Sequence, residues 1–147
     1  MPDTLDLPDP RTIIAFDFGL RRIGVAVGQD VTGSASPLGV VMNRETGVDH
    51  EAIEALLREW RPAQLVVGLP AHADGSPSDL QESVEGFIRE LERYGLPIAT
   101  IDERHTSTEA ARVLRDARRS GSRGRVSKES IDAAAAVFIA ERYLASR

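Results

Sequence analysis

The sequence contains no cysteine and only seven aromatic residues: four Phe, two Tyr and one Trp. Without cysteine, the chain has no disulfide, no cysteine-ligated zinc and no thiol nucleophile. The few aromatic residues form no evident platform for stacking bases, which many proteins use to bind single-stranded nucleic acid. The sequence therefore leaves the choice between RNA and DNA open for any function that involves nucleic acid.

No run of apolar residues approaches the length of a membrane span. The first ten residues carry acids and prolines where a secretory signal carries basic and apolar residues. We therefore expect a cytoplasmic protein without a membrane partner. Since no change of composition marks a linker, we expect one domain over residues 1–147, with residues 1–10 as a loose extension.

The chain is acidic overall, with a net charge of −5, but its charges are unevenly distributed. Residues 104–128 contain eight basic and two acidic side chains, so this segment carries +6 and the rest of the chain −11. Such a cluster is either a solvated helix and loop or a surface that binds phosphate. Charge alone does not decide between the two.

The spacing of apolar residues predicts an α/β fold. Two apolar runs, at 12–18 and 23–27, are separated by a short turn and predict a β-hairpin. Further strands are expected at 38–42, 65–67 and 98–101, and helices at 53–60, 80–91, from 106 and from 127, with a basic loop at 119–126. This order predicts a mixed sheet, with antiparallel strands first and then parallel strands connected by helices.

Glycine, proline and short polar residues set the expected ends of these elements. Residues 32–37 are rich in such breakers and predict a turn before the third strand. Pro62 is expected to end the first helix and Gly95 the second. The last helix is expected to follow the cap Ser127 and to bury an apolar face that includes Ile131, Ala135 and Phe138.

Asp17 follows an apolar strand and precedes Phe18 and Gly19. An aspartate in this place either makes a turn with its own backbone or binds a ligand at the end of the strand. The neighbouring glycine favours the second interpretation, because it lets a phosphate approach the main chain. Asp17 is therefore the first candidate site residue.

Asp102 and Glu103 close the strand at 98–101, at the carboxyl end where open α/β sheets bind ligands. They are either capping acids of the next helix, with Arg104 as partner, or residues of a site. Because side chains alternate along a strand, only one of the two acids can face the site. Glu103 is the preferred candidate, and Asp102 is the alternative.

Asp132 is expected in the second turn of the last helix, beyond the point where the helix dipole most favours an acid. The alanines at 133–136 follow it and predict close packing of the helix on the sheet. This pattern favours a carboxylate directed at a charged group. A solvent-facing aspartate is the alternative.

If Asp17, Glu103 and Asp132 converge, they form a site with oxygen ligands only, which favours Mg²⁺ or Mn²⁺ over Zn²⁺. Two such ions, about 3.5–4 Å apart, ionise a water on one side of a phosphodiester and stabilise the leaving oxygen on the other. This chemistry needs no separate histidine base. The three histidines are therefore interpreted as incidental: His50, His72 and His105. Orientation of a water is the alternative for the last of them.

Four ordered motifs resemble the YqgF family of ribonuclease H-like proteins, which are relatives of the RuvC resolvases. The motifs are AFDFGLRRIGVAVGQ, VVGLP followed by Asp74-Gly75, DERHTSTEA, and SIDAAAAV after the basic loop. The resemblance extends from about residue 12 to residue 145. It implies a five-stranded mixed sheet flanked by helices, and a metal-dependent nuclease. The family is described both as Holliday junction resolvases and as nucleases that mature the 5′ end of pre-16S ribosomal RNA.

The resemblance also implies roles for individual residues. By position, the family's acidic residues fall on Asp17, Glu103 and Asp132. The fourth strand ends in Gly68-Leu69-Pro70, where resolvase relatives carry a glutamate, so the third ligand is expected from Glu103. The basic residues expected to contact phosphate are Arg21, Arg22, Arg104, Arg123, Arg125 and Lys128.

Three functions compete at this point. The preferred hypothesis is an endonuclease that cleaves structured RNA, with ribosomal precursor RNA or precursor particles as its partner. The second is a resolvase of branched DNA, which places two active sites on opposed strands and so requires a homodimer rather than a monomer. The third is an RNA-binding module that has lost catalysis, against which the retention of all three acids speaks.

Overall fold

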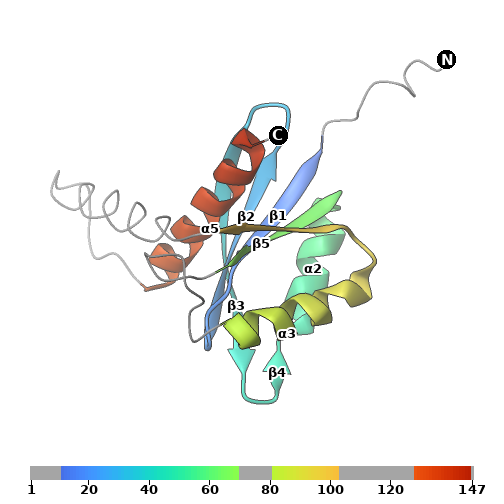
Figure 1. The fold of residues 1–147 in the computed structure, drawn as a ribbon, viewed down its shortest axis with the longest axis vertical. Helices are drawn as coiled ribbons and strands as arrows, with labels where there is room; N and C mark the ends of the chain where they lie inside the picture. The colour runs from blue at the N-terminus through green and yellow to red at the C-terminus, as the bar shows by residue number, and fades with distance from the viewer. Residues whose placement is uncertain (1–10, 70–80, 103–127, 147) are drawn as a thin grey trace, which may run out of the picture.

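The structure is a computed structural model that describes residues 11–69, 81–102 and 128–146. Within them, the chain forms a six-stranded sheet with helices on both faces (Figure 1). The strands are β1 (Thr12–Asp17), β2 (Arg22–Gln29), β3 (Ser34–Arg44), β4 (Gly47–Val48), β5 (Gln64–Leu69) and β6 (Ile98–Asp102). The helices are α2 (His50–Trp60), α3 (Gln81–Leu91), the 3-10 helix η1 (Glu92–Tyr94) and α5 (Lys128–Ala145).

The strand order is β4-β3-β2-β1-β5-β6. β1, β2 and β3 form an antiparallel meander, whereas β5 and β6 run parallel to β1. The predicted mixed sheet and its opening hairpin are therefore confirmed. The predicted count of five strands was wrong by one, because β4 has only two residues, which pair with Asn43 and Arg44 of β3 and carry no apolar pattern to detect.

The third strand begins at Ser34, four residues before the predicted start at Leu38. Thr32 and Gly33 form part of the predicted turn, but the rest of the breaker-rich segment pairs with β2, where Pro37 lies opposite Ala26. The register shifts beside this pair, at a β-bulge. Because β4 pairs only near the end of β3, no strand of the described residues lies on the outer side of Pro37, and a residue without an N–H is tolerated at such an edge.

The helices α2 and α3 end as the sequence predicts. α2 begins after Asp49, whose side chain accepts a hydrogen bond from the Ala52 N–H at 3.2 Å, and it ends at Trp60, shortly before Pro62. Arg61 caps its C-terminus in the left-handed conformation, with φ of 46°. η1 continues α3 by a short turn and ends at Gly95, which has φ of 74° and donates its N–H to the Glu92 carbonyl.

The sheet separates two apolar cores, as the positions of the helices in Figure 1 show. On one face, α2 and α3 cover β1, β2 and β5, with Phe16, Ile53 and Phe87 fully buried or nearly so. On the other face, α5 covers Ile13, Ala15 and Val66. Each strand residue therefore faces either α2 and α3 or α5, according to its parity along the strand.

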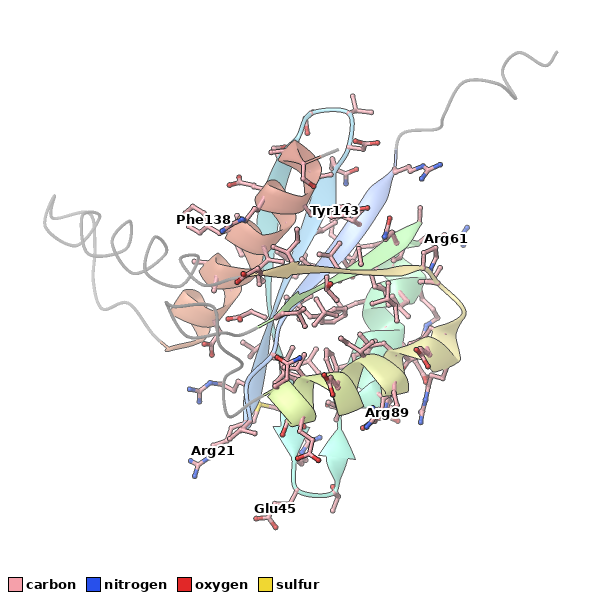
Figure 2. All side chains as sticks on the ribbon, viewed as in Figure 1. Arg21, Glu45, Arg61, Arg89, Phe138 and Tyr143 are labelled. Carbon is pink, nitrogen blue, oxygen red and sulfur yellow. The ribbon has the colours of Figure 1, made fainter. Side chains whose placement is uncertain are left out.

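α5 packs through small side chains. Ala133, Ala136 and Ala140 are buried with Ile139. The buried position of Ala135 is confirmed, but Phe138 is only half-buried, and Figure 2 shows it on the side of α5 away from β1 and β2. The prediction of Phe138 as part of the inner face was wrong, because the fully buried residues Ala136, Ile139 and Ala140 place the inner face on another side of the helix. Two other predictions for α5, the cap Ser127 and the burial of Ile131, lie outside the described residues. The helix expected from 106 and the loop at 119–126 also lie outside them.

Candidate active site

Asp17 is the last residue of β1 and lies opposite Gly24 of β2 and Gly68 of β5. Residues that lie opposite each other in a sheet present their side chains on the same face. Ile13 and Ala15, which share the parity of Asp17, belong to the core beneath α5. The half-buried side chain of Asp17 therefore lies on the α5 face, at the carboxyl end of β1.

Gly24 brings the backbone of α5 to the same place. A Cβ atom added at Gly24 would lie 2.0 Å from the carbonyl oxygen of Asp132 and 3.2 Å from the nitrogen of Ala133. No residue other than glycine leaves room for this approach. Gly24 lies opposite Asp17 in the sheet and also contacts the backbone of Asp132. β1, which carries Asp17, and α5, which carries Asp132, therefore both adjoin this glycine. We call this arrangement of Asp17, Gly24 and Asp132 the carboxylate corner.

An ion pair holds the side chain of Asp132 against the sheet. The Nε–H of Arg22 donates to Oδ2 of Asp132 at 3.1 Å, and the two side chains are 31% and 29% exposed. The partners are 110 positions apart in the sequence. Arg22 was predicted to contact phosphate, and the structure adds a contact with a candidate metal ligand that the sequence did not suggest.

β6 extends the same row of residues across the sheet. Ile101 lies opposite Gly68, and both Ile101 and Ala99 pack against the core beneath α5. Asp102 has the opposite parity and is exposed, so it does not share a face with Asp17. Glu103, the preferred candidate, lies outside the described residues, and its role stays a prediction.

The residues of the carboxylate corner suit a hard divalent cation. Two carboxylates without nitrogen or sulfur ligands match the preference of Mg²⁺ and Mn²⁺ for oxygen. Within residues 11–69, 81–102 and 128–146, no group of three side chains of metal-binding type is found. The predicted third carboxylate, Glu103, lies outside these residues.

His50 lies apart from the carboxylate corner, where α2 meets α3 and η1. Its Nδ1 contacts the hydroxyl of Tyr94 at 2.6 Å, and its Nε2 contacts Oε1 of Glu90 at 2.8 Å. Burial and the nearby carboxylate of Glu54 raise the pKa of the Tyr94 hydroxyl, while Arg93 opposes this shift. Through its contacts with Tyr94 and Glu90, His50 connects α2 with η1 and α3, on the side of the sheet that α2 and α3 cover. His72 and His105 lie outside the described residues.

Only part of the predicted phosphate-binding set can be located. Arg21 is exposed in the turn between β1 and β2, and Figure 2 shows its side chain pointing away from the sheet. Lys128 is the first residue of α5. The other candidates, apart from Arg22, lie outside the described residues: Arg104, Arg123 and Arg125.

The sequence pattern did not predict two features of the site. The close approach at Gly24 had a signal, because an isolated glycine inside an apolar strand often marks a backbone contact. The pair of Arg22 with Asp132 had none, because it depends on where α5 lies on the sheet.

No helix in the described part of the chain is long and apolar enough to cross a membrane.

A mixed sheet with α5 across one face and a carboxylate at the end of its first strand defines a protein of the ribonuclease H-like fold. Two solved structures share this fold. RuvC of Thermus thermophilus in complex with a Holliday junction substrate superposes with a TM-score of 0.57 at 14% identity, covering 93% of this chain and 95% of that chain. A second Thermus thermophilus RuvC structure gives 0.54 at 13% identity, covering 92% and 95%.

The chain belongs to the family described as "RuvX: Holliday junction resolvase", which matches residues 11–146. A Burkholderia lata protein is 46% identical over 134 residues, covering 90% of this chain and 88% of the relative. An Azotobacter vinelandii protein is 45% identical over 140 residues, covering 94% and 96%. Both are named "Putative pre-16S rRNA nuclease". The resemblance to the YqgF family is confirmed, and so is the predicted class of enzyme, a nuclease.

Proposed function

We propose that this protein is a metal-dependent endonuclease that cleaves structured RNA and processes the 5′ end of pre-16S ribosomal RNA. The observation that carries the proposal is the carboxylate corner, in which Asp17 and Asp132 approach the same glycine on one face of the sheet. The names of the relatives at 46% and 45% identity support the choice of RNA. Ribosomal precursors would place the activity in the cytoplasm, as expected from the sequence.

Asp17, Asp132 and Glu103 would hold Mg²⁺ or Mn²⁺, in a two-ion arrangement. Bound there, the cations would supply an ionised water and stabilise the leaving oxygen of a phosphodiester. The chain's own contribution is positional. β1 holds Asp17 in the register of the sheet, and the contact of α5 with Gly24 holds the backbone of Asp132 beside it.

Arginine and lysine side chains near the site would bind the phosphates of the substrate without reading its sequence. Arg21 is exposed in the turn that follows β1, close in sequence to Asp17. The proposed set is Arg21, Arg22, Arg104, Arg123, Arg125 and Lys128. These contacts position the strand, and the carboxylates act on it.

The test uses purified protein, Mg²⁺ and an RNA that carries the 5′ leader of pre-16S ribosomal RNA. Asp132→Asn should abolish cleavage, because an amide is a poor ligand for a hard cation. Its stability should change by less than about 1 kcal/mol, because its ion pair with Arg22 is partly exposed. Glu45→Gln, the same change in the exposed turn between β3 and β4 (Figure 2), is the matched control and should keep wild-type activity. Wild-type cleavage by Asp132→Asn would refute the site.

A second candidate is a resolvase of branched DNA, which the description of the family favours. This activity requires two active sites related by a twofold axis, and therefore a homodimer. Cleavage of a four-way DNA junction together with a dimer at micromolar concentration would support it. A strict monomer that cuts only RNA would exclude it, and RNA binding without any metal-dependent cleavage would instead indicate a module without catalysis.

A further inference from the structure

Arg22 begins β2 and lies two residues before Gly24, so both residues belong to the face of the sheet that α5 covers. Its backbone is held by the sheet, opposite Met42 of β3. From this anchored position, the side chain reaches Asp132 on α5. β2 therefore positions both the guanidinium of Arg22 and Gly24, which is two residues further along the strand and belongs to the carboxylate corner.

The contact between the two side chains engages one oxygen of the carboxylate. The Nε–H of Arg22 donates to Oδ2 of Asp132 at 3.1 Å. Within the described residues, Arg22 is the one side chain that forms a hydrogen bond or ion pair with this carboxylate, and it does so at Oδ2. A carboxylate held by one oxygen presents the other to a ligand in a restricted orientation.

We propose that Arg22 is a positioning residue that orients Asp132 for the metal, through the hydrogen bond to Oδ2. The inference rests on the proposed function and deepens it. Hydrogen bonds to ligating carboxylates orient them, and their loss typically weakens metal binding or activity about 10- to 100-fold. The role differs from the phosphate contact expected for Arg22 from the sequence, since here the guanidinium contacts Asp132 rather than the nucleic acid.

Arg22→Gln removes the guanidinium and distinguishes the two roles. Loss of a positioning residue weakens the binding of metal, whereas loss of a phosphate contact weakens the binding of RNA. As a positioning variant, it should raise the dissociation constant for Mn²⁺, measured by calorimetry without nucleic acid, by about 10-fold. Its affinity for the precursor RNA in EDTA should fall no further than that of Arg21→Gln. Arg21 is the matched control, since it is exposed and adjacent, and its variant should bind Mn²⁺ like the wild type.

Arg22→Lys separates orientation from a general loss of structure, because its ammonium group can still donate to Oδ2. It should restore most of the Mn²⁺ affinity that Arg22→Gln loses, and both variants should melt within a few degrees of the wild type. If Arg22→Gln binds Mn²⁺ as tightly as the wild type and loses only RNA affinity, the positioning role is overturned. If the wild type itself binds Mn²⁺ no better than Asp132→Asn, the metal site fails, and with it the proposed function.

Discussion

Gly24→Ala tests the packing that places Asp132. The new Cβ would lie 2.0 Å from the carbonyl oxygen of Asp132 and 2.5 Å from its carbonyl carbon. These are backbone atoms, which cannot rotate aside as the end of a long side chain can. Since a Cβ needs at least 3.0 Å, α5 must move away from β2 by about 1 Å.

The magnitude follows from two opposed effects. Overpacking at such a contact costs about 1–3 kcal/mol, and the clash with backbone places Gly24→Ala at the upper end. Alanine in a strand recovers about 0.5–1 kcal/mol relative to glycine, which leaves a loss of about 2 kcal/mol. For a chain of this size, such a loss lowers the melting temperature by roughly 4–8 °C. A displacement of Asp132 by about 1 Å should also lower the rate of cleavage, by up to about 100-fold.

Gly86→Ala is the matched control in the interior of α3. A Cβ at Gly86 would meet only the end of the Arg89 side chain, at 3.8 Å. Alanine favours a helix over glycine by up to about 1 kcal/mol, so this variant should melt higher than the wild type and cleave normally. Differential scanning fluorimetry and a cleavage assay on both variants suffice. Wild-type stability and activity of Gly24→Ala would refute the close contact of α5 with β2.

Three further predictions concern the turn after α2, the pH dependence of stability and the binding of RNA. Arg61 is a left-handed residue with φ of 46°, so Arg61→Gly should raise the free energy of unfolding by about 0.5–1 kcal/mol in a urea titration. Burial, and after it the carboxylate of Glu54, raise the pKa of Tyr94 above its ordinary value of 10.0. The stability that Tyr94 contributes is therefore present below pH 10 and is lost as the pH rises through its pKa in the folded state. Unfolding titrations of Tyr94→Phe between pH 9 and pH 11 should therefore show a smaller loss of stability than the wild type, and an equal loss would contradict the assignment. Arg21→Gln should reduce the slope of log affinity for RNA against log salt by about 1, and an unchanged slope would mean that Arg21 contacts no phosphate.

Most helices and strands of the fold were predicted from the sequence, because breakers and the spacing of apolar residues largely determine where they begin and end. Pro62 and Gly95 marked the ends of α2 and η1, and the change from helical to extended spacing located β5. The start of β3 was missed because Pro37 is normally a breaker, and only its place on the sheet edge makes a strand possible there. Pairing between strands, rather than local preference, decided that boundary.

The site was predictable as a set of candidates but not as an arrangement. The position of Asp17 at a strand end and of Asp132 beside small residues marked them individually. Their meeting at Gly24, and the ion pair of Asp132 with Arg22, depend on contacts between segments about 110 residues apart. Parity along β6 places Asp102 on the face opposite to that of Asp17, but only the register with β5 reveals this.

The most direct test of the account is the location of a bound metal ion. Crystals of the wild-type protein soaked in Mn²⁺ should show an anomalous peak at the carboxylate corner, with oxygens of both Asp17 and Asp132 at roughly 2.0–2.5 Å. The same soak of Asp132→Asn should show the peak lost or strongly reduced. A peak that involves neither aspartate, or none at Mn²⁺ concentrations that support cleavage, would contradict the central claim that these two acids hold the catalytic metal.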